Sequence, residues 1–165
     1  LFDNLTVWEN VSFRLLQKSG TSRHDAREIA IEKLKQVGLP ADTADLSPAE
    51  LSGGMQKRTG LARAIATDPE ILFLDEPTAG LDPIMSNIIS DLINDRVDDL
   101  GASAISIVSD LAVVRRIADT VVMLHEGRVV WSGTVAELDE TDNAYVRQFV
   151  SQSIEGPIRM PALAG

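Results

Sequence analysis

Residues 71–77 read ILFLDEP: four apolar residues run directly into two carboxylates and a proline. A short apolar run of this kind is typical of a strand buried in a parallel sheet. Open α/β sheets bind ligands at the carboxyl ends of their strands, so we expect Asp75 and Glu76 to face a site. In such a pair Asp75 helps to hold Mg²⁺, while Glu76 orients and deprotonates an attacking water. A surface turn is the alternative, because Asp-Glu-Pro is also a common loop sequence.

On both sides of this strand, apolar periodicity assigns the other elements. Residues 1–67 are expected to be mostly helical, and the apolar positions Ala26, Ala30, Leu34 and Val37 recur at helical spacing. Four helix starts pair a hydroxyl cap with an acid three residues later, namely Thr6 with Glu9, Ser22 with Asp25, Ser47 with Glu50 and Thr134 with Glu137. The elements expected after residue 77 are a helix through Ile84, Ile88 and Leu92, a second buried strand at 104–108, a helix at 111–118, a hairpin of 120–124 with 128–131, and a last helix at 144–152.

This order of elements predicts an α/β fold with a helical segment in front. We expect three parts: a helical subdomain at 1–67, an α/β core portion at 68–140, and a C-terminal helix and tail at 141–165.

A second motif, Leu51-Ser52-Gly53-Gly54-Met55-Gln56, leads directly into a predicted helix. Paired glycines at a helix start let the backbone approach an anion, and the free N–H groups and positive dipole end favour phosphate. Ser52 adds a hydroxyl donor. The sequence therefore predicts a phosphate-binding position here, although a helix start capped by water is the more frequent meaning of Ser-Gly-Gly.

Composition narrows the classes of function. The 165 residues carry 25 acidic and 15 basic side chains, for a net charge of −10, which disfavours nucleic-acid binding through a basic surface. The chain has no cysteine, so disulfides, thiolate zinc sites and cysteine nucleophiles are excluded and any metal must bind carboxylates. No apolar run approaches the roughly 18 residues that span a bilayer, so a membrane role requires a partner.

Three stretches, LSGGMQKR at 51–58, LARAIATDP at 61–69 and ILFLDEPTAGLDP at 71–83, follow one another in an informative order. In this order and spacing they resemble the nucleotide-binding subunit of ATP-binding cassette (ABC) transporters, and the likeness runs from residue 5 to about 138. The resemblance implies a partial P-loop NTPase fold whose helical subdomain bears the signature motif and docks onto membrane subunits.

The resemblance also implies roles for individual residues. It assigns Ser52, Gly53 and Gly54, called the signature loop below, and the neighbouring Gln56 to nucleotide binding. Asp75 becomes the metal ligand and Glu76 the catalytic base of the Walker B strand. Asp82 lies in the D-loop, at 79–82, and is also expected to contact nucleotide, although as the residue before Pro83 it is equally suited to cap a helix.

A narrower resemblance lies at the two ends of the chain. LFDNLTVWENVSF at 1–13, and YVRQF at 145–149 with EGP at 155–157, are similar to the ATPase of Mla-type systems. These ABC complexes work with lipid-binding MCE-domain proteins to move phospholipids or other hydrophobic molecules across the bacterial envelope. An amphipathic terminal helix that packs on its own domain is the alternative for 145–149.

Two departures from the ABC pattern bear on mechanism. The sequence contains no G-x-x-x-x-G-K-[ST], the loop that cradles the β and γ phosphates, and it begins without methionine inside a helix-start pattern. We therefore expect a piece of a longer protein that does not hydrolyse ATP on its own. Ser109 is followed directly by Asp110, where the family has a histidine that contacts the γ phosphate; neither His24 nor His125 is placed to replace it.

The sequence predicts the carboxy-terminal two-thirds of an ABC ATPase, which hydrolyses ATP with Mg²⁺ at the interface of a head-to-tail homodimer. Its expected partners are a second ATPase subunit, transmembrane permease subunits and, indirectly, an MCE-domain lipid-binding protein, at the cytoplasmic face of the bacterial inner membrane. One alternative is a binding and dimerisation module without catalysis. Another is a non-transport ABC ATPase acting on ribosomes or DNA, which the acidic charge and the sequence at 79–82 disfavour.

Overall fold

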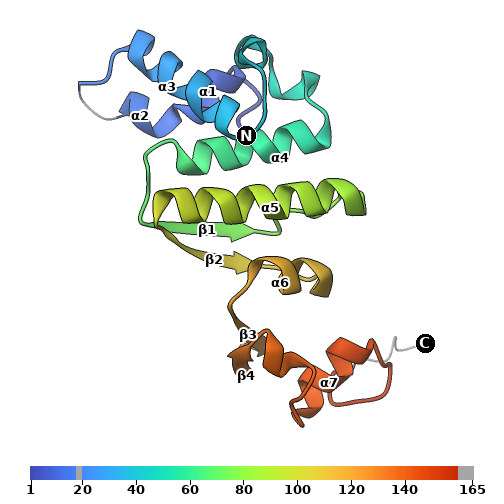
Figure 1. Ribbon diagram of the computed structural model, residues 1–165. Helices are drawn as coiled ribbons and strands as arrows, with labels where there is room; N and C mark the ends of the chain where they lie inside the picture. Colours follow the sequence, from blue (N-terminus) through green and yellow to red (C-terminus); the bar gives the residue numbers. More distant parts are fainter. Residues whose placement is uncertain (18–19, 160–165) are drawn as a thin grey trace. The chain divides into compact units, whose positions relative to one another are not determined.

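The computed structural model describes residues 1–17 and 20–159, and the chain divides into two compact units, Leu1–Ser109 and Asp110–Gly165. In the first unit a group of helices precedes a two-stranded sheet (Figure 1). Its elements are α1 (Val7–Val11), α2 (Phe13–Gln17), α3 (Arg23–Gln36), η1 (Ala41–Asp45), η2 (Pro48–Glu50), α4 (Gly53–Ile65), β1 (Ile71–Asp75), α5 (Pro83–Leu100) and β2 (Ser103–Ile107). The expectation that residues 1–67 are mostly helical is thus confirmed. Residues 160–165 of the expected tail lie outside the described residues.

One hydrophobic core holds the first unit together. The predicted stripe of α3 is confirmed, since Ala26, Ala30 and Leu34 are all fully buried. Helix α4 packs against α1, α3 and α5, and Ile65 and Ile89 bring α4 and α5 into the same core. Because α4 contacts helices on both sides, the residues at its start are fixed relative to α5.

The first turn of the chain is held by the fully buried side chain of Asn10. Its Oδ1 accepts the Phe2 N–H at 2.7 Å, and its Nδ2 donates to the carbonyl oxygens of Phe2, Leu5 and Thr6 at 3.0 to 3.2 Å. One side chain therefore joins four backbone groups of residues 2–6 to the start of α1.

Strands β1 and β2 form a parallel pair, as predicted, but the expectation that both are buried is wrong. Only Leu72 of β1 is buried, because its face of the sheet packs into the core. On the other face, register places Phe73 beside Ile105, and these side chains are 73% and 56% exposed, with Ile107 at 63%. Side chains alternate between the two faces of a strand, so one whole apolar face of this pair is uncovered.

The second unit contains α6 (Leu111–Ile117), β3 (Thr120–His125), β4 (Arg128–Thr134), η3 (Ala136–Leu138) and α7 (Ala144–Ser151). The predicted hairpin is confirmed around Glu126 and Gly127, which both have positive φ, 47° and 73°, as a tight two-residue turn requires. The strands extend beyond the predicted limits to His125 and Thr134, and the register shifts between Met123 and Leu124.

In the same unit, Gln148 of α7 attaches the segment that follows the helix. Its Nε2 donates to the carbonyl oxygens of Ser153 and Ile158, at 3.2 and 2.9 Å, and its Oε1 accepts the Ile158 N–H at 2.7 Å. Gln148 is only 8% exposed. This single amide therefore orders residues 153–158 against α7.

The four predicted caps differ in outcome. Thr6 and Glu9 form a complete capping box at the start of α1, and Ser22 caps α3 by accepting the Asp25 N–H. Ser47 and Glu50 also form a box, but the helix after it is a three-residue 3-10 turn.

The fourth cap is a correction. Glu137 accepts the N–H and the hydroxyl of Thr134 at 2.7 and 2.9 Å, yet Val135 is the N-cap and only the 3-10 turn η3 follows. The capping chemistry was predicted correctly, and the helix was not.

Candidate functional site

The signature loop lies at the amino end of α4. Ser52 is the N-cap, and its Oγ accepts the Met55 N–H at 3.3 Å. Gly53 and Gly54 are the first two helical residues, so their N–H groups have no partner within the helix. Ser52 and Gly53 are exposed, which leaves these donors and the positive end of the helix dipole open to an anion.

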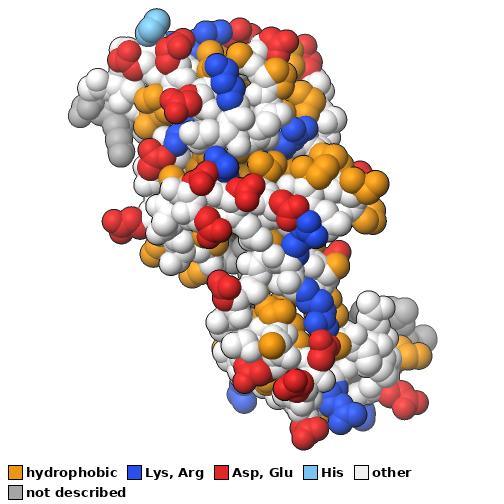
Figure 2. All heavy atoms as spheres, in the orientation of Figure 1, with side chains coloured by type: hydrophobic (Ala, Val, Ile, Leu, Met, Phe, Trp, Pro, Cys, Tyr) orange, Lys and Arg blue, Asp and Glu red, His pale blue; other side chains and the backbone are white. Residues whose placement is uncertain are grey.

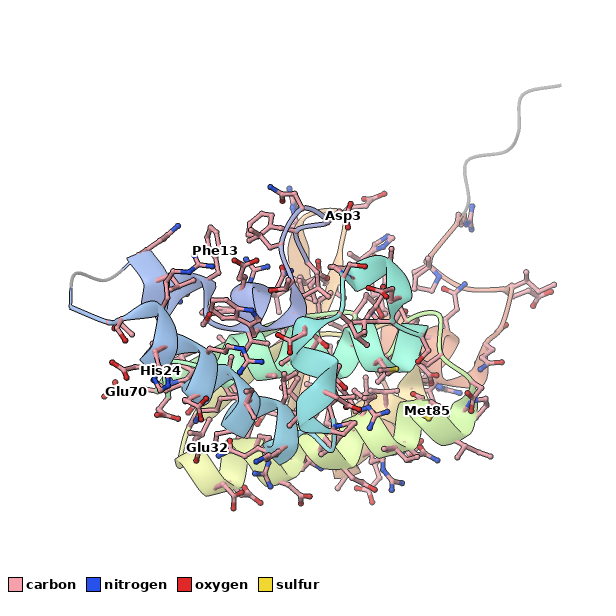
Figure 3. All side chains as sticks on the ribbon, turned by 90° about the horizontal axis from the view of Figure 1, so that it is seen from above. Asp3, Phe13, His24, Glu32, Glu70 and Met85 are labelled. Carbon is pink, nitrogen blue, oxygen red and sulfur yellow. The ribbon has the colours of Figure 1, made fainter. Side chains whose placement is uncertain are left out.

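Side chains behind the loop fix the position of its backbone. The amide nitrogen of Gln56 donates to the carbonyl oxygens of Pro48 and Leu51, at 3.1 and 3.4 Å, so Gln56 ties α4 to the segment before it. A Cβ on Gly54 would lie 2.8 Å from Cε of Met85, which is labelled at the start of α5 in Figure 3. The structure thus gives Gln56 a positioning contact, with its Oε1 left for a further partner.

Asp75 and Glu76 follow one another at the carboxyl end of β1, as predicted. Asp75 is exposed, and Glu76 is half-buried. Glu76 has φ of 44°, a left-handed conformation that is strained for a residue with a side chain. Its N–H donates to the Ile107 carbonyl at 2.9 Å, and its own carbonyl accepts the Ala79 N–H at 3.2 Å. These bonds hold the turn against β2.

The structure gives Asp82 a capping contact. Its Oδ1 accepts the N–H groups of Ile84 and Met85, both at 3.0 Å, at the start of α5. Asp110, at the junction where the family histidine is missing, likewise caps α6 by accepting the Ala112 N–H at 2.8 Å. Each carboxylate keeps its second oxygen available to another partner.

A groove of about 730 Å³ runs between α4 and β1. Gly53, Gln56 and Asp75 line it, together with residues of the D-loop, Ala79, Gly80 and Leu81. The fold therefore brings parts of the two predicted motifs to one hollow. Ser52, Gly54, Glu76 and Asp82 do not line it.

Lys57 and Arg63 of α4 also line the groove, beside the acidic Asp3 and Asp75. The Arg63 guanidinium lies over the rings of Phe2 and Phe13, 4.6 and 5.4 Å from their centroids. Next in sequence to Ala49, which lines the groove, the backbone N–H of Ser47 and then its hydroxyl hold the pKa of Glu50 below its usual value. The described lining of the groove thus carries both cationic and acidic side chains.

Magnesium is compatible with the side chain at the end of β1. Within residues 1–17 and 20–159, no three His, Asp or Glu side chains gather as a metal cluster. Mg²⁺ is usually held by only one or two carboxylates and completed by water and substrate phosphates, so the exposed Asp75 suits it.

Neither histidine is among the residues that line the groove. His24 projects from α3 with its side chain 83% exposed (Figure 3). His125 belongs to β3, where its ring lies 5.2 Å from that of Tyr145.

Sequence reasoning did not single out Lys57. Its Nζ donates to the carbonyl oxygen of Glu76 at 2.9 Å, which joins the signature helix to the turn after β1. Lys57 directly follows Gln56 in the quoted motif, but no local pattern predicts a bond to a backbone carbonyl 19 residues away.

The chain contains no helix, among residues 1–17 and 20–159, that is long and apolar enough to cross a bilayer. The sequence model of the ABC transporter family matches residues 1–79.

Curated relatives cover nearly the whole chain. It is 41% identical to the Arabidopsis thaliana chloroplastic protein TRIGALACTOSYLDIACYLGLYCEROL 3 over 96% of this chain and 50% of that protein. It is 36% identical to the Haemophilus influenzae intermembrane phospholipid transport system ATP-binding protein MlaF, over 96% and 60%. Methionine import ATP-binding protein MetN 1 of Rhodococcus jostii is 44% identical, over 81% and 39%. The chain thus spans about half the length of the curated relatives it matches.

Among solved structures, the fold is similar to the ATP-binding cassette MJ0796 in a dimeric, post-hydrolysis state bound to ADP and Pi. The TM-score is 0.72 at 31% identity, over 82% of this chain and 59% of that one. From its motifs, its relatives and this shared P-loop fold, the chain belongs to the ABC transporter family of ATP-binding subunits.

Proposed function

We propose that this chain is part of an ATP-hydrolysing subunit that powers the transport of lipids or other hydrophobic molecules across a bacterial envelope. The observation that carries the proposal is the convergence of the two motifs. Gly53 at the start of α4 and Asp75 at the end of β1 line the same groove, so the fold exposes anion donors and a carboxylate beside each other. In a head-to-tail pair the donors face the ATP of the second subunit, and Asp75 serves the ATP of its own subunit.

The proposed chemistry divides among four groups. The N–H groups of the signature loop bind phosphate oxygens of an ATP held by a second subunit. Gln56 and Asp82, each fixed by backbone contacts, use their remaining oxygens toward the nucleotide or its water. Asp75 holds Mg²⁺, which neutralises charge on the phosphates when bound. Glu76 orients the attacking water and accepts its proton.

A second ATPase subunit is the proposed partner across the signature loop, in head-to-tail arrangement. MJ0796, with which the fold is shared, is described as dimeric. In this chain, Ile84 and Ile88 next to the D-loop are 73% and 43% exposed, and Figure 2 shows hydrophobic atoms gathered over the start of α5. Exposed apolar patches beside polar loops are typical of protein interfaces.

The proposed division of labour along the chain follows the sequence. Residues 1–67 act as the signature-bearing subdomain that docks on permease subunits, 68–140 as the catalytic core portion, and 141–165 as a C-terminal attachment. Permease docking places the subunit at the cytoplasmic face of the inner membrane, with an MCE-domain protein as an indirect partner.

The lipid substrate is supported by the similarity to MlaF, which is named for phospholipid transport. The similarity to MetN 1, named for methionine import, makes methionine the competing substrate. Coverage does not decide between them, because the methionine import protein MetN of Lactobacillus johnsonii is 38% identical over 94% of the chain. We favour lipid because residues 1–13 and 145–149 resemble the ATPase of Mla-type systems.

Hydrolysis is tested in a chimeric cassette in which residues 1–165 replace the matching region of MJ0796, so that a lysine loop is present. We expect Mg²⁺-dependent ATP turnover, and we expect Glu76→Gln to lower it by about two orders of magnitude or more. Glu70→Gln, at the other end of the same strand, is the matched control and should leave turnover unchanged. The chain alone should show no turnover, since it has no lysine loop.

An inactive chimera that still dimerises with ATP would instead support the binding module without catalysis. The substrate is tested with the full-length subunit that contains this chain, reconstituted in liposomes with its own permease subunits, by following the ATP-dependent movement of a fluorescent phospholipid and of labelled methionine. Movement of methionine alone would overturn the lipid assignment.

A further inference from the structure

We propose that Lys57 is a positioning residue that sets the geometry of Glu76 from the signature helix. The inference rests on the proposed catalytic role of Glu76. Lys57 touches neither the proposed water nor the phosphates. It acts through the backbone of the residue that does.

The first observation is the bond itself. Lys57 Nζ donates to the Glu76 carbonyl oxygen at 2.9 Å, and the lysine side chain is half-buried. The same carbonyl accepts the Ala79 N–H at 3.2 Å. A hydrogen bond from a charged donor is about twice as strong as a neutral one, so the ammonium is the stronger of the two restraints.

The second observation is the conformation that the bond restrains. Glu76 has φ of 44°, which costs on the order of 1–3 kcal/mol for a residue with a side chain. Such a conformation persists only where its surroundings enforce it. Here the Glu76 N–H is held by Ile107 of β2, and the carbonyl is held by Lys57 of α4. The peptide groups on both sides of the Glu76 Cα are therefore fixed by different elements.

The third observation is where Lys57 originates. It lies one helical turn beyond Gly53 and Gly54, on the helix whose start forms the signature loop. Because an α-helix transmits a shift along its axis with little loss, a displacement of the signature loop moves the Lys57 side chain as well. The bond thus couples the position of α4 directly to the backbone of Glu76 in the same subunit.

Kinetics of the chimeric cassette test this role. Lys57→Met keeps the length of the side chain and removes the donor, and we expect kcat to fall by about tenfold or more with KM for ATP changed less than about threefold. Lys57→Arg keeps a charged donor and should recover kcat to within about threefold. Equal losses in both variants, or a loss in KM alone, would overturn the proposal.

Arg58→Met is the matched control. The neighbouring Arg58 makes the same kind of bond, from its Nη1 to the Gly38 carbonyl at 2.9 Å, but away from Glu76. It should cost stability and leave kcat unchanged. If Arg58→Met lowers kcat as much as Lys57→Met does, the loss follows from removing any such bond of α4, and the positioning role of Lys57 is wrong.

Amide hydrogen exchange on the full chain needs no ATPase activity. In Lys57→Met, the Glu76 and Ala79 amides should exchange about fivefold faster or more, whereas the amide of Leu72 in the centre of β1 should not change. If the Glu76 amide exchanges at the wild-type rate in Lys57→Met, Lys57 does not restrain the Glu76 backbone and the proposal is overturned. An inactive chimera with the expected exchange would instead count against the catalytic role of Glu76, so the two failures are distinguishable.

Discussion

The end of the Met85 side chain lies directly against the backbone of Gly54, where a Cβ would come within 2.8 Å of its Cε. The signature loop and the start of α5 are therefore in contact, and a side chain at position 54 fits only if Met85 moves.

Gly54→Ala separates folding from function at this contact. The Met85 methyl is the far end of a flexible side chain and can move aside, and alanine favours helix, so the free energy of unfolding should change by less than about 1 kcal/mol. Moving Met85 aside shifts the signature loop relative to the start of α5, so its N–H groups are no longer aligned with a phosphate and turnover of the chimeric cassette should fall by about tenfold or more.

Chemical denaturation and steady-state turnover check these two effects. Gly60→Ala on the same helix, where a Cβ meets nothing within 4 Å, should raise stability by about 1 kcal/mol and so calibrate the helix preference. Undiminished turnover in the Gly54→Ala cassette would show that the signature loop does not bind the phosphate.

Insertion of a histidine between Ser109 and Asp110 tests the shortened junction. If the family resemblance holds at this junction, the γ phosphate lacks one donor there, and a contact of this kind is worth about 2–4 kcal/mol in the transition state. Asp110 still caps α6 after the insertion, because its bond to Ala112 is local. The chimeric cassette should gain at least about tenfold in turnover. No gain, in a cassette that already hydrolyses ATP well, would show that the histidine is dispensable.

The uncovered face of β1 and β2 predicts association of the isolated chain. Phe73, Ile105 and Ile107 form an exposed apolar strip on a sheet that has only two strands. Sedimentation should show concentration-dependent association, which Phe73→Ser reduces with a stability change below about 1 kcal/mol. Leu72→Ser, on the buried face, should instead unfold the chain. A reversible melt that is independent of concentration would contradict this prediction.

Glu9 predicts a loss of stability in acid. The backbone N–H of Thr6 and then the Arg23 guanidinium hold its pKa below the usual value of a glutamate. A carboxylate with a lowered pKa stabilises the fold fully above its unfolded value, and this contribution disappears as pH falls through the folded value. Between pH 5 and 3, Glu9→Gln should therefore lose less stability than the wild type, by about 1 kcal/mol. Urea unfolding at both values measures this, and Glu32→Gln, exposed on α3, should match the wild type.

Thr59 offers a stabilising substitution. It is fully buried in α4, and its Oγ1 has no hydrogen-bond partner. Thr59→Val keeps the shape and removes the unsatisfied hydroxyl, so the free energy of unfolding should rise by about 1 kcal/mol. Ser90→Ala is the contrasting control, because the Ser90 hydroxyl donates to the Ser86 carbonyl at 2.8 Å and its loss should destabilise. A destabilised Thr59→Val would mean that the hydroxyl has a partner.

Sequence reasoning succeeded where the determining interactions are local. Capping depends on residues three positions apart, so the contact of Thr6 with Glu9 could be predicted from their spacing. The turn at Glu126 and Gly127 is likewise set by its own two residues and the strands beside them. Helix length after a cap is decided by packing, which is why only the 3-10 turn η3 follows Thr134.

The parts that could not be predicted depend on contacts distant in sequence. The left-handed conformation of Glu76 is imposed by Ile107 and Lys57, 31 and 19 residues away. An apolar run such as 71–74 indicates a strand but does not say which faces are covered, so the exposure of Phe73 was missed. The two motifs of the site were each visible, and only the packing of α4 beside β1 shows that they share a groove.

The amide of Gln148 that orders residues 153–158 has a property that an ion pair in its place would lack. A glutamine offers a donor and an acceptor together at every pH, and it carries no charge for dissolved salt to screen. Elsewhere in the same unit, the ion pair of Arg115 with Asp139 weakens as acid protonates the aspartate. Acidification and high ionic strength therefore weaken this ion pair on the surface of the unit before they affect residues 153–158, which the Gln148 amide holds until α7 itself melts.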